Sequence, residues 1–171
     1  MPALRIILLA TLGAIVYGLV QDQVTARICV EYFTIGHPRI IESESPTALA
    51  LAWGVVATWW VGLPLGVLLA VAARAGARPA LTWRDLVRGV ATLLLVVAAV
   101  ATLAGVVGHT LASSGSVFLI EPLASRVPKE RHVAFLTDLW IHSAAYAAGF
   151  LGGPTLALLT WRRRGRPAAA T

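Results

Sequence analysis

Long apolar stretches alternate with short polar stretches along the whole chain. The apolar stretches cover about residues 4–25, 49–73, 86–111 and 133–161. Each is long enough to cross a bilayer core of about 30 Å, which takes about 20 helical residues. Pro64 lies inside the second stretch and is expected to kink its helix. The pattern predicts an all-α protein whose residues 1–171 form a single transmembrane domain, an integral membrane four-helix bundle.

Two short motifs mark where helices are expected to begin. The polar stretch from Ser43 to Pro46 offers a cap followed by proline in the first turn of the second span. Before the third span, Thr82 and Asp85 have the spacing of a capping box.

The composition agrees with a membrane protein. Hydrophobic residues make up 58% of the chain and charged residues 13%, about half the charged share of an ordinary soluble domain. The net charge of +6 does not indicate nucleic-acid binding, because the arginines flank apolar stretches and no phosphate-cradling glycine motif is present. A cleaved secretory signal is the alternative for the first apolar stretch. That stretch runs on to Gln21 without a typical cleavage site, so an uncleaved span is favoured.

Basic residues gather on alternate sides of the predicted spans. The loops after the first and third spans carry acidic residues beside their basic ones, whereas the other polar segments are mostly basic. The positive-inside rule therefore predicts a multi-pass protein of the cell membrane with its N- and C-termini in the cytoplasm. The residues expected on the cytoplasmic side are Arg5, Arg74, Arg78, Arg84, Arg88, Arg162, Arg163, Arg164 and Arg166.

Polar side chains fall at one depth when about 20 residues are counted outward from the cytoplasmic arginines. Asp138, His142 and Tyr146 share one helix face by i, i+4 spacing, and Arg27 is expected to pair with Glu31 for the same reason. Because ionisable groups at this depth face the interior of a bundle or water, we predict a polar cluster at its extracytoplasmic mouth. The cluster comprises Asp22, Gln23, Arg27, Cys29, Glu31, His37, His109, Asp138, His142 and Tyr146.

The cluster admits more than one chemistry. Carboxylates and imidazoles from facing helices can ligate a divalent metal ion, and the candidate ligands are Glu31, His109, Asp138 and His142, with Asp22 or His37 completing the set. Paired metal motifs such as His-Glu-x-x-His are absent from the sequence, so a structural hydrogen-bonded network is favoured. A nucleophilic Cys29 with a histidine base is a weaker alternative, because spacing alone gives no signal for it.

Three segments, "YGLVQDQVTARICVEYFTIGHPRI", "SPTALALAWGVVATWWVGLPLGVLLAVAARAG" and "WIHSAAYAAGFLGG", carry a resemblance. They resemble a family of small, uncharacterised bacterial four-span membrane proteins with a DQVTxRxCxEYFTxxHP-like motif. The resemblance implies no activity. Gln21 stands where similar sequences have histidine, which weakens a metal site centred there. The residues that match the motifs are Asp22, Gln23, Thr25, Arg27, Cys29, Glu31, Tyr32, Phe33, His37, Pro38, His142 and Tyr146.

The sequence thus predicts an integral membrane protein with a polar site at its outer face. A structural or partner-binding role is favoured, with the lipid bilayer and either a second copy of the chain or another membrane protein as partners. The alternative is a metal-binding protein or a metal-dependent membrane enzyme that uses the Asp/Glu/His cluster. Whether the chain is an enzyme is left open.

Overall fold

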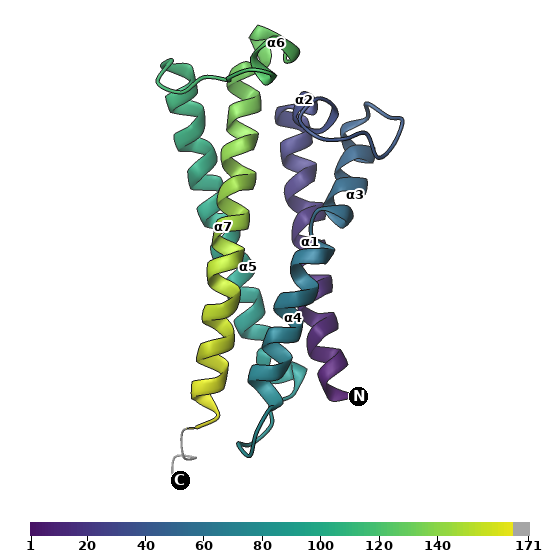
Figure 1. Cartoon of the computed structure of the whole chain (residues 1–171), viewed down its shortest axis with the longest axis vertical. Coiled ribbons are helices and arrows are strands. Elements are labelled where there is room, and N and C mark those ends of the chain that lie inside the picture. The colour runs from purple at the N-terminus through teal and green to yellow at the C-terminus, as the bar shows by residue number, and fades with distance from the viewer. Residues whose placement is uncertain (166–171) are drawn as a thin grey trace.

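The computed structural model describes residues 1–165, and every regular element in that range is a helix (Figure 1). Arg166, expected among the cytoplasmic arginines, lies outside the described residues. The α-helices, in chain order, are α1 Pro2–Ile28, α2 Val30–Thr34, α3 Pro46–Val56, α4 Trp59–Arg74, α5 Trp83–Ser113, α6 Leu123–Arg126 and α7 His132–Arg163, and a 3₁₀ turn, Lys129–Arg131, directly precedes α7.

The long helices form two antiparallel hairpins that lie side by side (Figure 1). In the first hairpin, α1 packs against α3 and α4, which follow one another along one line. In the second hairpin, α5 packs against α7. Contacts of α4 with α7 and of α1 with α5 join the two hairpins. The beginning of α1 and the end of α7 lie at the same end of the molecule, and the short helices α2 and α6 lie at the other end (Figure 1).

Glycines let the helices of the first hairpin approach closely. A Cβ on Gly54 would lie 2.7 Å from the Leu19 backbone, and a Cβ on Gly62 would lie 2.9 Å from the Thr11 Cα. Both positions, one in α3 and one in α4, therefore face α1. Small residues on a shared face are the usual means by which helices pack without a strong hydrophobic driving force.

Both predicted helix starts are confirmed. The Ser45 hydroxyl accepts a hydrogen bond from the Ala48 N–H at 3.5 Å, with Pro46 in the first turn of α3. The Thr82 N–H donates to the Asp85 carboxylate at 2.8 Å, which is one half of the capping box of α5. The carboxylate of Asp85 is therefore engaged at the start of α5.

The second span is interrupted at Ala57 and Thr58, which precede the kink that the sequence predicts at Pro64. Helix α3 ends at Val56, α4 begins at Trp59, and Pro64 lies inside α4. At the interruption the Thr58 hydroxyl donates to the Gly54 carbonyl at 2.5 Å, a side-chain bond of the kind that bends helices.

Three helical stretches of the described residues are long and apolar enough to cross a membrane: Pro2–Ile28, Pro46–Arg74 and Trp83–Ser113. The fourth predicted span falls in α7, which has ample length at 32 residues but is not among these three. Asp138, His142 and Pro154 lie within α7 and reduce its apolar character. An all-helical protein with three helical stretches that could cross a membrane is therefore shown for residues 1–165, and the fourth span belongs to the proposal below.

Candidate functional site

Asp138, His142 and Tyr146 form a polar stripe along one face of α7. Its helical spacing predicts a shared face, and His142 and Tyr146 both contact the first hairpin. The His142 Nε2 lies 3.2 Å from the Thr25 hydroxyl oxygen and 3.9 Å from the nearer Asp22 carboxylate oxygen. One turn further along, the Tyr146 hydroxyl donates to the Ala57 carbonyl at 3.1 Å. That carbonyl belongs to the interruption between α3 and α4. The break in the second span thus exposes a backbone acceptor that Tyr146 uses.

Aromatic rings cover this stripe on the side of α2. The Tyr32 ring stacks on the His142 ring with a centroid separation of 4.8 Å. His37 contacts Tyr32 by its ring at 4.8 Å, and its Nδ1 lies 2.8 Å from the Tyr32 carbonyl oxygen. The ring of Trp53, from α3, lies 4.8 Å from that of His37. His37 therefore helps to hold Tyr32 over His142 and lies against α3.

Two buried carboxylates lie here, Asp138 within the stripe and Asp22 on α1. Asp138 is fully buried, and neither of its carboxylate oxygens has a hydrogen-bond partner among residues 1–165. Asp22 is 4% exposed. A buried carboxylate without a hydrogen-bond donor is costly in its charged form.

Glu31 does not pair with Arg27, which is a correction to the expected i, i+4 ion pair. Helix α1 ends at Ile28 and Cys29 is extended, so the helical spacing across residues 27–31 is lost. Arg27 donates instead to Thr47 of α3 at 2.8 Å and to Gln23.

The partner of Glu31 is Arg131, which sequence reasoning missed. The Arg131 Nε donates to the Glu31 carboxylate at 2.9 Å, and another of its nitrogens donates to the Ile28 carbonyl at 3.0 Å. Partial burial by itself would raise the pKa of Glu31. The hydrogen bonds that Glu31 accepts from a backbone N–H, Arg131 and Cys29 outweigh burial and hold the pKa below its ordinary value. No local signal connects residues 100 positions apart.

Cys29 is buried completely and donates its thiol proton to Glu31 at 3.3 Å. Burial, as the largest cause, raises the pKa of Cys29 to about 12. The thiolate is the nucleophilic form of cysteine, so a thiol with this pKa is a poor nucleophile at neutral pH. The geometry gives no support to covalent catalysis by Cys29.

The four candidate metal ligands do not meet at one point. Glu31 is held by Arg131, and the His109 Nδ1 lies 3.2 Å from the Thr137 hydroxyl oxygen, within the second hairpin. In the part of the chain that the structure describes, no group of three or more His, Cys, Asp or Glu side chains is placed to hold a metal ion. Around His142, the side chains that come together across the hairpins are those of Asp22, Thr25 and Tyr32, and Tyr146 reaches the Ala57 carbonyl one turn further along.

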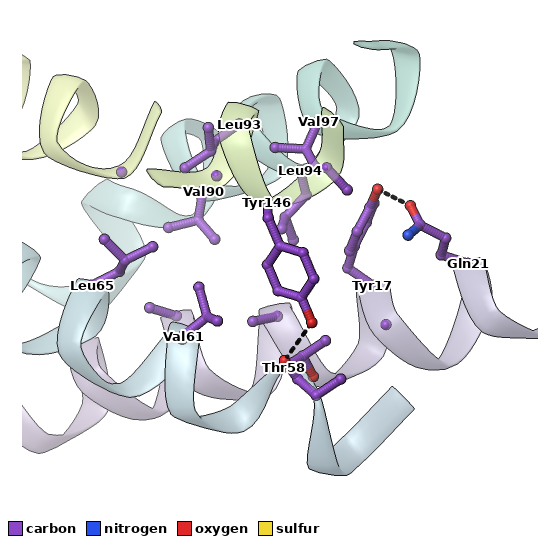
Figure 2. Close-up of a pocket in the computed structure, with 18 of the residues that line it drawn as sticks. Tyr17, Gln21, Thr58, Val61, Leu65, Val90, Leu93, Leu94, Val97 and Tyr146 are labelled. Atoms are coloured by element: carbon purple, nitrogen blue, oxygen red, sulfur yellow. Dashed lines mark hydrogen bonds between the residues drawn. The ribbon is translucent and has the colours of Figure 1, made fainter. Parts of the chain in front are cut away.

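A cavity of about 120 Å³ lies between the hairpins, next to this polar stripe. We call it the inter-hairpin cavity; its walls are mainly leucine, valine, alanine and glycine from α1, α4, α5 and α7. Figure 2 shows Tyr146 projecting into it, with Val61 and Leu65 to one side and Tyr17 and Gln21 to the other. Its polar lining residues are Tyr17, Gln21, Asp22, Thr58, His142 and Tyr146.

Comparison of the chain with protein-family models, with curated proteins and with solved structures gave no match. The resemblance to small bacterial four-span proteins therefore stays a prediction, and the function is argued from the geometry.

Proposed function

We propose that the chain is a four-span protein of the cell membrane, with both termini in the cytoplasm, that binds a small amphipathic molecule between its hairpins. The fourth span in this proposal is α7. It packs along α5, which is itself long and apolar enough to span, and leucines such as Leu151 and Leu159 are exposed on its outer face. The basic residues at the end of α4, in the following loop and in the first turns of α5 support the orientation through the positive-inside rule; they are Arg74, Arg78, Arg84 and Arg88.

The inter-hairpin cavity is the observation that carries the binding proposal. Ligand sites are typically apolar hollows with a few convergent polar groups, and this cavity has that chemistry. Its 120 Å³ is close to the roughly 150 Å³ of an engineered apolar cavity that admits benzene. A ring or a short chain therefore fits its size.

The polar groups of the cavity define the head of the ligand. Asp22 and His142 are both lining residues, and they offer a hydrogen-bond acceptor and a donor-acceptor ring. Leu65, Leu93 and Leu94 supply apolar wall for a tail. A molecule with a hydroxyl at one end and an apolar body satisfies both parts of the cavity.

A structural role is the second candidate, and the cross-hairpin contacts favour it. The bond from Tyr146 to Ala57, the contact of His142 with Thr25 and the bond from Arg131 to Glu31 all join the second hairpin to the first. In this role the polar stripe only holds the hairpins together, and the cavity is incidental.

Binding of 4-methylphenol, a single ring with a hydroxyl at one end and a methyl group at the other, tests the proposal. We expect the purified full-length protein to bind one molecule saturably, as measured by calorimetry in detergent or by native mass spectrometry. Gly149 lines the cavity, and a Cβ there would meet no atom within 4 Å, so Gly149→Leu places bulk in the cavity. This variant should bind roughly tenfold more weakly or worse.

Thr155→Leu is the control, because Thr155 is exposed on the same helix and this variant places the same leucine side chain outside the cavity. It should bind like the unmodified protein. The absence of saturable binding to the unmodified protein, or equal binding by Gly149→Leu, would leave the structural role and remove the ligand proposal.

A further inference from the structure

A second hollow, of about 540 Å³, lies at the opposite end of the molecule from the polar stripe. It is formed by the first turns of α5 and the last turns of α7, which lie side by side at the end of the molecule that holds both chain termini (Figure 1). We call it the arginine hollow, because Arg84, Arg88 and Arg163 line it. It shares only Leu156 with the inter-hairpin cavity, so it is a separate site; it rests on the proposed membrane orientation but not on ligand binding in that cavity.

The arginine hollow carries an excess of positive charge. Arg84 and Arg88 are i, i+4 on α5 and present their side chains to one side of it, and Arg163 approaches from α7. All three are exposed, and none makes a hydrogen bond or salt bridge to another of the described residues. Asp85 is the single acidic lining residue, and one of its carboxylate oxygens accepts hydrogen bonds from the N–H and the hydroxyl of Thr82 at 2.8 and 2.7 Å. Three arginines against one carboxylate leave the hollow with an excess of two positive charges. The Arg84 guanidinium lies over the Trp83 ring, 5.6 Å from its centroid, a contact that leaves its N–H donors free for an anion.

Guanidinium groups match phosphate because their planar N–H donors can bind two oxygens at once. The backbone N–H groups at the start of α5 are partly used by the capping box. An anion here is therefore bound mainly by side chains.

The apolar part of the lining distinguishes a lipid from a free ion. Leu86, Leu156 and Leu159 line the hollow beside the arginines, and Leu159 is exposed. Both helices continue from this point into apolar stretches. A phosphate bound by the arginines would therefore lie directly beside apolar side chains, against which the acyl chains of a lipid could pack.

We propose that Arg84, Arg88 and Arg163 bind the phosphate of an anionic phospholipid, whose acyl chains lie against the leucines of α5 and α7. In the proposed orientation the site faces the cytoplasmic leaflet, where anionic lipid attracts basic side chains next to a membrane span.

Native mass spectrometry of the full-length protein in detergent tests this, with phosphatidylglycerol and phosphatidylcholine of identical acyl chains as probes. We expect saturable binding of phosphatidylglycerol at least roughly tenfold tighter than that of phosphatidylcholine. The triple variant Arg84→Gln, Arg88→Gln, Arg163→Gln should lose this preference. The control triple Arg39→Gln, Arg126→Gln, Lys129→Gln removes the same charge from exposed residues at the other end and should keep it.

Three outcomes overturn the proposal: equal binding of the two lipids, an unchanged preference in the arginine triple variant, or equal losses in both triple variants. Displacement of phosphatidylglycerol by inorganic phosphate at equal concentration would also overturn it, because the site would then bind free phosphate. If the arginine triple variant does not fold, Arg84→Gln and Arg163→Gln alone should each weaken phosphatidylglycerol binding, and unchanged binding in both would contradict the proposal.

Discussion

Gly149 lies on α7 among the residues that line the inter-hairpin cavity. A Cβ at this position meets no atom within 4 Å. Glycine inside a helix costs roughly 0.5–1 kcal/mol relative to alanine, mainly through backbone entropy. We expect Gly149→Ala to raise the free energy of unfolding by about that amount, as measured by unfolding in mixed detergent micelles.

Gly108→Ala is the contrasting variant at the same scale. A Cβ on Gly108 would lie 2.4 Å from the Cγ of Trp140, so α5 and α7 must separate or the indole must move. Overpacking of this kind typically costs about 1–3 kcal/mol. Equal effects of the two alanines would contradict the described packing of α7.

The ion pair of Glu31 and Arg131 predicts a pH dependence of stability. The pKa of Glu31 is lowered from 4.5 in the folded protein, so the pair stabilises the fold above that pH. Its contribution is lost as the pH falls through the lowered pKa. The two side chains are 20% and 36% exposed, and water screens the pair, so we expect at most about 1 kcal/mol.

The measurement is the unfolding free energy of the protein and of Glu31→Gln between pH 7 and pH 3. The difference between them should shrink toward acid pH. A difference that stays constant over this range would show that the ion pair does not contribute.

At the scale of the helical elements, the Arg164 side chain caps the C-terminal end of α4. Its guanidinium, in a residue only 5% exposed, donates to the carbonyls of Ala72 at 2.7 Å and Ala75 at 3.0 Å. It also donates to the carbonyls of Arg78 and Pro79 in the following loop, at 2.8 and 2.7 Å. The last carbonyls of a helix have no partner within the helix, and a cation there also opposes the helix dipole.

We expect Arg164→Ala to lower the free energy of unfolding by about 3 kcal/mol, because several buried carbonyls lose a charged donor. Arg164→Lys should recover only part of this, since one ammonium group cannot reach all four carbonyls. Arg162→Ala is the control from the same turn, because Arg162 is exposed. Thermal unfolding in detergent measures all three, and equal losses for Arg162→Ala and Arg164→Ala would contradict the capping role.

Local signals in the sequence predicted elements well. The apolar stretches gave the long helices, and the caps at Ser45 and Thr82 placed two of their starts, because capping depends on neighbours within a few residues. The interruption at Thr58 was missed, since threonine in a helix has no obligatory effect on the backbone. The Arg27–Glu31 pair was wrong, because its spacing assumed a helix that ends at Ile28.

Contacts between elements were harder to predict. The i, i+4 stripe of Asp138, His142 and Tyr146 correctly indicated one face, and the counted depth brought His142 to the level of Asp22. The pairing of Glu31 with Arg131 depends on the path of the chain through α6 and the turn before α7. No pattern of neighbouring residues in the sequence encodes that path.

For the whole molecule, the proposed orientation predicts which loops an impermeant reagent reaches. Cys29 is fully buried, so the natural chain gives little background in cysteine labelling. We expect Ser116→Cys, after α5, to react with an impermeant maleimide in intact cells or spheroplasts. Ala77→Cys, after α4, should react only once the membrane is opened, and both positions are exposed.

Labelling of Ala77→Cys but not Ser116→Cys in intact cells would show that the orientation is the opposite of the proposed one. Labelling of both positions in intact cells would mean that α5 does not cross the membrane.

The contacts of Arg164 also bear on the order in which the protein is made. Its acceptors, from Ala72 to Pro79, precede it by 85 to 92 residues. The ribosome therefore completes α1, α3 and α4 while the carbonyls at the end of α4 still depend on water. Since chains fold from the N-terminus as they emerge, the first hairpin must persist without this arginine during translation of the second. Insertion of the first hairpin and its attachment to the second are thus separate steps in time.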